Sequence, residues 1–122
     1  MYYILNEREG KEVFDSRLNT ATSNYVVNQL KLDEPAIHFS IHKPTVMIGR
    51  YQNAFAEVDQ QYLEDQDITL LRRLSGGGAV YHDLGNIMFM LTGPNDGAGQ
   101  KHFAEYSKPI LDAISSLGVS EV

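Results

Sequence analysis

The sequence predicts an α+β domain in which an antiparallel or mixed β-sheet is backed by helices. Several short β-branched and aliphatic runs follow one another without long helices between them, which favours antiparallel or mixed pairing. Residues 103–117 instead repeat apolar side chains at helical spacing. The 122 residues contain no repeat, low-complexity tract or linker. A chain of this length makes one modest domain with enough buried surface for a real core.

Four elements are predicted in the first half: a strand over residues 3–5, a helix over residues 16–30, and strands over residues 36–41 and 45–48. Asp15 or Ser16 is the expected N-cap of the helix, because both side chains can accept a hydrogen bond from its first turn. The two later strands are predicted to form a hairpin around Lys43 and Pro44.

The second half is predicted to hold a short helix over residues 58–64, strands over residues 68–71, 79–82 and 86–91, and the helix over residues 103–117. A glycine-rich loop joins the first two strands, and the run 88–91 is typical of a buried central strand. The sequence Asn-Asp-Gly at 95–97 is a turn signal within a loop over residues 93–99. Pro109 requires the last helix either to kink or to begin near Lys108, and Gly118 is its expected cap.

Composition limits the classes of function. The chain has 16 acidic and 10 basic residues, a net charge of −6 and no basic tract, so no nucleic-acid or membrane partner is expected. No apolar run approaches the roughly 20 residues that span a bilayer, and the first residues lack the features of a signal peptide. We therefore expect a cytoplasmic protein. The absence of cysteine excludes disulfides, thiolate metal sites and cysteine nucleophiles from this chain.

Residues 72–86, RRLSGGGAVYHDLGN, are the best evidence for chemistry. Three consecutive glycines after a strand can take positive φ and let a phosphate or other oxyanion approach their N–H groups. The side chains of Arg72 and Arg73 should point to opposite faces of an extended segment, so one is expected to reach the loop, and we choose Arg73. A loose hairpin with a solvated arginine pair is the alternative interpretation.

Two familiar nucleotide loops are disfavoured. No Gly-Lys-Ser/Thr closes the segment, as a Walker loop requires, and Tyr81 stands where a dinucleotide fingerprint has its third glycine. A strand rather than a helix follows the glycines, so a phosphate would be bound without a helix dipole.

Metal sites are the weaker interpretation of the histidines. His82 and Asp83 are adjacent, so they face opposite ways unless the strand has already ended at the turn. His38 and His42 share one strand face, but no third ligand is evident, and a solvated or hydrogen-bonded pair is expected instead.

The run 72–86 matches RRxSGGGAVxHDxGN at every fixed position and thereby resembles the lipoate-protein ligase A family, relatives of biotin ligases and octanoyl transferases. Residues 46–53, VMIGRYQN, resemble that family's VIGRxQN strand and turn. Residues 103–110 with 117–119 are similar to the helix after its central sheet. The resemblance implies the class II synthetase and biotin ligase fold, with residues 1–122 as the N-terminal portion of one catalytic domain.

The resemblance also implies an activity. Lipoate would attack ATP, with Mg²⁺ as the expected ion, to give lipoyl-adenylate, and the acyl group would pass to a lysine of a lipoyl-domain protein. The expected acceptors are the acyltransferase subunits of 2-oxoacid dehydrogenases and the glycine cleavage H protein. An octanoyl transferase, a biotin ligase, or a non-catalytic acyl- or nucleotide-binding module are the alternatives.

The resemblance assigns site residues by position. ATP and adenylate contacts are expected at Arg73, Gly76, Gly77, Gly78, Ala79, Val80 and Tyr81. Lipoate contacts are expected at Arg72, Ser75, His82, Thr20 and Ser40, and Asp83 and Asn86 are expected to hold the turn. No metal ligand set is expected in the protein.

The sequence departs from the family in three places. Residues 19–24 read NTATSN where relatives read Asn-Leu-Ala-x-Glu-Glu, which puts Thr20 in place of an aliphatic residue. Ser40 occupies a position that is often aromatic, so the acyl specificity can differ from that of lipoate. The catalytic lysine of the family is expected beyond Val122.

Overall fold

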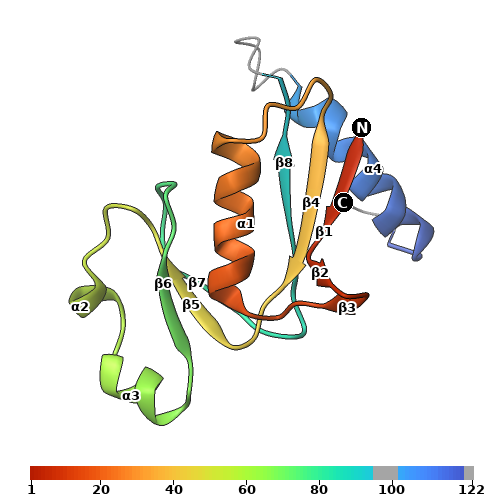
Figure 1. Ribbon diagram of the computed structural model, residues 1–122. Coiled ribbons are helices and arrows are strands. Elements are labelled where there is room, and N and C mark those ends of the chain that lie inside the picture. The colour runs from red at the N-terminus through yellow and green to blue at the C-terminus, as the bar shows by residue number, and fades with distance from the viewer. Residues whose placement is uncertain (95–101, 120–122) are drawn as a thin grey trace.

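The computed structural model describes residues 1–94 and 102–119. The elements in chain order are β1 (Tyr2–Leu5), β2 (Glu7–Arg8), β3 (Lys11–Glu12), α1 (Ser16–Asn28), β4 (Ala36–Ile41), β5 (Thr45–Ile48), α2 (Ala54–Glu57), α3 (Gln60–Asp65), β6 (Thr69–Arg72), β7 (Val80–His82), β8 (Ile87–Thr92) and α4 (Phe103–Ser116). The predicted α+β class is confirmed (Figure 1).

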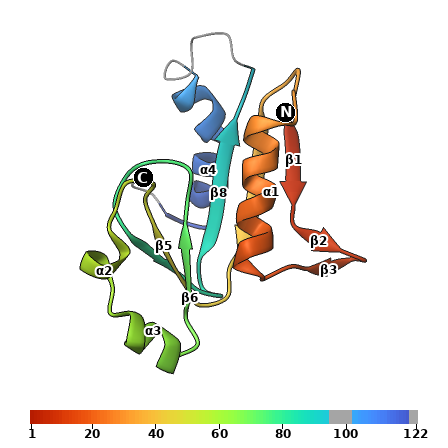
Figure 2. The same cartoon turned by 60° about the vertical axis from the view of Figure 1, so that its left-hand side comes forward.

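Two three-stranded sheets form the framework. In the first, β4 lies between β1, which it pairs in parallel, and β8, which it pairs in antiparallel register. In the second, β5 lies between the parallel strand β6 and the antiparallel strand β7. Each sheet is therefore mixed, as the sequence predicts. Helices α1 and α4 lie on opposite sides of the first sheet, with α1 against β4 and α4 against β8 (Figures 1 and 2).

The predicted hairpin between residues 36–41 and 45–48 is wrong. Strands β4 and β5 follow each other in the chain but belong to different sheets, because β1 and β8 occupy both edges of β4, and β6 and β7 occupy both edges of β5. The link between the two strands instead carries the chain from one sheet to the other, and His42 within it is buried. The run 88–91 is also not a central strand, since β8 lies at the edge of its described sheet and Phe89 is exposed.

The interface between α1 and the first sheet is polar. Besides Ile37 and Val26, the residues with almost no exposure include six polar ones: Ser16, Asn19, His38, Ser40, His42 and Thr45. Asn19 donates to the carbonyl of Ile41 at 2.8 Å and accepts from Asn6 at 2.6 Å. His38 contacts Asn6 at 2.8 Å and Ser23 at 3.2 Å. These bonds compensate the cost of burying polar groups and fix the position of α1 on the sheet.

Local signals account for the ends of the two long helices. The Asp15 carboxylate accepts from the amides of Arg17 and Leu18, which confirms the predicted N-cap of α1. Helix α4 begins at Phe103 and contains Pro109, so it does not begin near Lys108. Gly118, at φ 93°, ends it as predicted.

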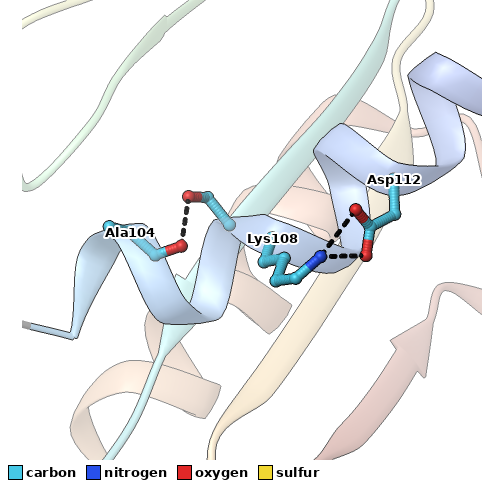
Figure 3. Close-up of polar contacts among 4 residues, drawn as sticks. Ala104, Lys108 and Asp112 are labelled. Atoms are coloured by element: carbon cyan, nitrogen blue, oxygen red, sulfur yellow. Dashed lines mark hydrogen bonds and ion pairs between the residues drawn. The ribbon is translucent and has the colours of Figure 1, made fainter.

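Exposed side chains of α4 bond along the helix (Figure 3). Lys108 Nζ lies 2.8 Å from both carboxylate oxygens of Asp112, and the Ser107 hydroxyl donates to the carbonyl of Ala104. Because both charged groups are largely exposed, this pair adds little to stability.

Other segments differ in detail from the predictions. The short helix predicted over residues 58–64 is confirmed as α3, which Asp59 caps, and a further short helix that was not predicted, α2, precedes it and is capped by Asn53. The hairpin β2–β3 is an element that the sequence did not suggest, with Glu9 and Gly10 at positive φ in its turn. The turn predicted at 95–97 lies outside the described residues. Within the described ranges, no helix is both long and apolar enough to cross a membrane.

Candidate ligand site at the glycine loop

The glycine loop joins β6 to β7, the two strands on either side of β5. Gly76, Gly77 and Gly78 are exposed, and Gly77 has φ 94°, a conformation that favours glycine. Among the described residues, no hydrogen bond is recorded from their three amides. A Cβ atom at Gly76 or Gly78 would meet nothing within 4 Å. The loop therefore offers free N–H groups at an open surface.

The loop rests on the end of β5. Gly49 is buried there, and a Cβ atom on it would overlap the carbonyl oxygen of Gly77 and lie 3.0 Å from its carbonyl carbon. The Arg50 amide donates to the Ser75 carbonyl at 2.9 Å, which ties the same turn to the loop. Glycine at position 49 is thus required by close backbone approach rather than by its own dihedral angles.

Arg73 braces the loop from inside. Its Nη2 donates to the carbonyls of Gly76 at 2.9 Å and Gly78 at 2.7 Å, and its Nε donates to Gly76 at 3.2 Å. Its Nη1 donates to the carbonyl of Met47 on β5 at 3.1 Å. The guanidinium therefore holds the loop against the second sheet with most of its N–H groups.

The orientation of the carbonyls decides where the amides point. The C=O of one residue and the N–H of the next point in opposite directions across a trans peptide. Because the carbonyls of Gly76 and Gly78 face Arg73, the amides of Gly77 and Ala79 face away from it. The carbonyl of Gly77 faces Gly49, so the Gly78 amide faces away from β5. The outward donors are thus shifted by one residue from the glycines themselves.

Arg72 serves the neighbouring turn. Its Nη1 donates to the carbonyls of Gly49, Arg50 and Gln52 at 3.0, 3.2 and 2.6 Å. The Gln52 side chain in turn accepts from the Gly49 amide at 2.8 Å. The two adjacent arginines therefore diverge, as expected for an extended segment, with Arg73 at the loop and Arg72 at the turn after β5. A lipoate contact for Arg72 stays a prediction.

His82 ends β7, opposite Thr45 of β5. Its half-buried ring stacks on that of His42, with the centroids 5.3 Å apart and the planes at 28°. His42 Nε2 lies 3.1 Å from the Ser40 hydroxyl. His42 thus links Ser40 and His82, the two residues here that are predicted to contact lipoate. His42 itself was not among the predicted site residues.

Burial and nearby charge keep these rings neutral at neutral pH. Burial lowers the pKa of His82, and the positive charge of Arg73 lowers that pKa further, while Asp83 opposes the shift. Burial lowers the pKa of His42 to about 4, with the charges of His82 and His38 adding to the effect. Burial likewise lowers the pKa of His38.

The other predicted site residues are spread over two places. Val80 and Tyr81 are exposed on β7, next to exposed Ala79, and Ser75 is exposed in the loop. Thr20 is half-buried on α1, where its hydroxyl donates to the carbonyl of Ser16 at 2.7 Å. Its contact with an acyl chain stays a prediction.

Asp83 and Asn86 both make hydrogen bonds within the turn that follows β7. The Asp83 carboxylate accepts from the Gly85 amide at 2.8 Å, and the Asn86 side-chain oxygen accepts from the Asp83 amide at 3.2 Å. These bonds close the connection between β7 and β8. Neither residue belongs to a metal cluster, because no group of three histidine, cysteine, aspartate or glutamate side chains is so placed within residues 1–94 and 102–119.

Sequence reasoning missed Gly49 and His42 as parts of this site. Gly49 stands within the GRYQN segment, so the resemblance of that segment carried a signal for it. His42 had no such signal: its alternation with His38 and Ser40 placed it on one strand face, but its stacking partner comes from a strand about 40 residues later.

These features define a class of protein: an α+β protein whose exposed glycine loop turns backbone N–H donors outward, where an anion can approach them. The chain belongs to the family of lipoyl protein ligase A/B catalytic domains, which matches residues 15–122. It is similar to lipoate-protein ligase 1 of Staphylococcus aureus, with 40% identity over 88% of this chain and 33% of that protein. It is also similar to the lipoate-protein ligase LplJ of Bacillus subtilis, with 37% identity over 91% of this chain and 34% of that protein.

Solved structures agree with the family and the fold. A crystal structure of lipoate-protein ligase A bound with ATP matches with a TM-score of 0.65 and 36% identity, over 74% of this chain and 35% of that chain. A lipoate protein ligase homologue from T. acidophilum with bound lipoic acid matches with a TM-score of 0.67 and 32% identity, over 81% and 41% of the two chains. A bi-partite lipoate protein ligase from Thermoplasma acidophilum, studied with its E2 lipoyl domain, matches with a TM-score of 0.77 and 29% identity over 98% of this chain and 46% of that chain. This chain spans about a third of the length of the curated relatives.

Proposed function

We propose that this chain supplies the nucleotide and acyl part of an enzyme that activates lipoate with ATP and transfers it to a lysine of a lipoyl-domain protein. The observation that carries the proposal is the glycine loop, whose carbonyls are held by Arg73 and whose amides at Gly77, Gly78 and Ala79 face outward. Relatives bound with ATP and with lipoic acid support the two ligands.

The chemistry needs a site for negative charge. The lipoate carboxylate attacks the α-phosphorus of ATP, pyrophosphate leaves, and the product is a mixed anhydride. Charge develops on the α-phosphate oxygens, so preoriented N–H donors beside a fixed cation lower the barrier. The outward amides are the donors, and the Arg73 charge lies directly behind them. In the second step a lysine amine attacks the acyl carbonyl, AMP leaves, and an amide forms.

His82 lies at the acyl side of this arrangement. Its ring is neutral at neutral pH because burial and Arg73 both lower its pKa. A neutral imidazole can donate one hydrogen bond to the carboxylate or carbonyl of the acid without adding a charge that must be desolvated. Mg²⁺ would accompany ATP and help to neutralise the charge that develops on its phosphates.

The acceptor partners follow from the same reaction. Lipoyl domains present the lysine that takes the acyl group, and a related ligase was studied together with its E2 lipoyl domain. We therefore propose 2-oxoacid dehydrogenase acyltransferase subunits and the glycine cleavage H protein as acceptors.

Calorimetry with a non-hydrolysable lipoyl-adenylate analogue tests the proposal. Arg73→Ala should weaken binding at least tenfold, about 1.4 kcal/mol, because it removes the cation and releases the loop. Arg8→Ala on β2 removes the same charge at an exposed position away from the loop and should bind as the parent does (Figures 1 and 2). Equal affinities for all three proteins would place the phosphate elsewhere. Tighter binding of a biotinyl- or octanoyl-adenylate analogue would show that biotin or octanoate, rather than lipoate, is the acid that the site prefers.

A further inference from the structure

His42 is a buried residue that no known feature of the site explains. It follows β4, is 1% exposed, and shares the α1-facing side of that strand with His38 and Ser40. Its Nε2 is anchored by the Ser40 hydroxyl. Its Nδ1 has no hydrogen-bond partner among the described residues, which costs free energy for a buried polar atom. A side chain selected for packing alone would not carry that nitrogen.

The ring of His82 depends on His42 for its orientation. Strand pairing with Thr45 fixes the backbone of His82, but within residues 1–94 and 102–119 no hydrogen bond is recorded for its two ring nitrogens. The one recorded ring contact of His82 in that part of the chain is the stack on His42 at 5.3 Å. Without that stack, the contacts recorded for the described residues would leave the His82 ring free to rotate about χ1 and χ2.

We propose that His42 is a positioning residue that holds the His82 ring, through the stack between them, in the orientation needed to meet the acyl group. The inference rests on the proposed function for its catalytic meaning, but the geometry that it assigns can be tested without any ligand. His42 would not touch the substrate itself; it would act through the ring stacked on it.

The surrounding charges fit this role. His38 on β4, Arg73 after β6, His82 on β7 and Asp83 in the following turn are the titratable or charged groups that act on the pair. Burial lowers the pKa of His42 to about 4, so its ring is uncharged at neutral pH and adds no cation repulsion to the stack there.

Histidine-selective NMR titration of this chain tests the geometry directly. His42→Ala removes the stacked ring and opens His82 to water, so the pKa of His82 should rise towards its ordinary value of about 6.5. His42→Phe keeps an aromatic ring in place and should leave the His82 titration unchanged. Leu63→Ala on α3 removes a buried side chain elsewhere and serves as the control for general loosening, with no change expected at His82. His42→Leu, which keeps bulk but not the stack, replaces His42→Ala if that variant fails to fold.

Binding of the lipoyl-adenylate analogue gives the second readout. His42→Ala should bind roughly tenfold to a hundredfold more weakly, because a displaced ring loses its hydrogen-bond geometry, while His42→Phe and Leu63→Ala should bind within about twofold of the parent. An unchanged His82 titration in His42→Ala would overturn the inference, and so would a loss of binding in His42→Phe equal to that in His42→Ala. If the parent chain binds no analogue, the proposed function fails on that result, and the titration alone still decides whether His42 holds His82.

Discussion

Replacing Gly49 by alanine tests the arrangement of the loop on β5. The new Cβ atom would overlap the carbonyl oxygen of Gly77 and lie 3.0 Å from its carbonyl carbon and 3.3 Å from that of Gly76. These neighbours are backbone atoms, so no flexible side chain can move aside. Either the end of β5 or the glycine loop has to shift.

The magnitude follows from what such a shift gives up. Overpacking a closely packed site costs about 1–3 kcal/mol. Moving the loop away also weakens the bond from the Arg50 amide to the Ser75 carbonyl, worth about 1 kcal/mol. Gly49→Ala should therefore lower the free energy of unfolding by about 2–4 kcal/mol, which corresponds to a fall in Tm of roughly 10 °C for a domain of this size.

Thermal unfolding followed by circular dichroism measures the effect, and Gly78→Ala is the matched control. A Cβ atom at Gly78 meets nothing within 4 Å, so its Tm should stay within about 2 °C of the parent. The control has a second use, because a methyl group on the outward side of the loop should still obstruct the adenylate analogue. A Gly49→Ala protein with the parent's Tm would refute the close contact between β5 and the loop.

Three further changes probe other parts of the structure. Arg72→Ala should lower the free energy of unfolding by about 1–2 kcal/mol in urea titrations, because the carbonyls of Gly49, Arg50 and Gln52 lose their shared donor; Arg17→Ala, an exposed arginine on α1, should change it by less than about 0.5 kcal/mol. The folded-state pKa of His42 is about 4, below that of the unfolded chain, so the unfolded state binds the proton first and stability falls as pH drops from about 6.5 to about 4. Over that pH range, the free energy of unfolding of the parent should fall by about 3 kcal/mol more than that of His42→Phe, as measured by urea titrations at each pH. Parallel curves of stability against pH for the two proteins would contradict the lowered pKa of His42. Asp15→Ala should cost about 1 kcal/mol at neutral pH through loss of the α1 cap, whereas Asp15→Ser should cost less than half as much, and equal costs for the two variants would assign the loss to charge instead.

Local chemistry was readable from the sequence, and pairing over long distances was not. The N-cap at Asp15, the cap at Gly118 and the strands on either side of the glycine loop depend on neighbouring residues, and each was predicted within one or two positions. The predicted hairpin between β4 and β5 is wrong because two strands that are neighbours in the sequence need not be neighbours in a sheet. Strand partners depend on which edges are already occupied, and β8, far along the chain, takes the edge that the prediction gave to β5.

The candidate site likewise has features that local sequence predicts and contacts that it does not predict. The glycine loop and the divergence of Arg72 and Arg73 follow from residue types and strand alternation, so both could be stated beforehand. The contact between Gly49 and Gly77 and the stack between His42 and His82 join segments about 30 to 40 residues apart, and nothing local encodes them. The polar surface of β4 was visible as alternating His38, Ser40 and His42, but its burial under α1 was not.

Arg73 gives the glycine loop its direction as well as its charge. A run of three glycines has little conformational preference of its own, so free in solution its amides would sample many orientations. Arg73 removes that freedom by binding the carbonyls of Gly76 and Gly78, and Gly49 removes more by receiving the carbonyl of Gly77. With every carbonyl turned inward, peptide geometry leaves the amides of Gly77, Gly78 and Ala79 turned outward before any ligand arrives. An anion then meets donors whose ordering cost has already been met during folding, which is the condition for strong electrostatic stabilisation of a transition state.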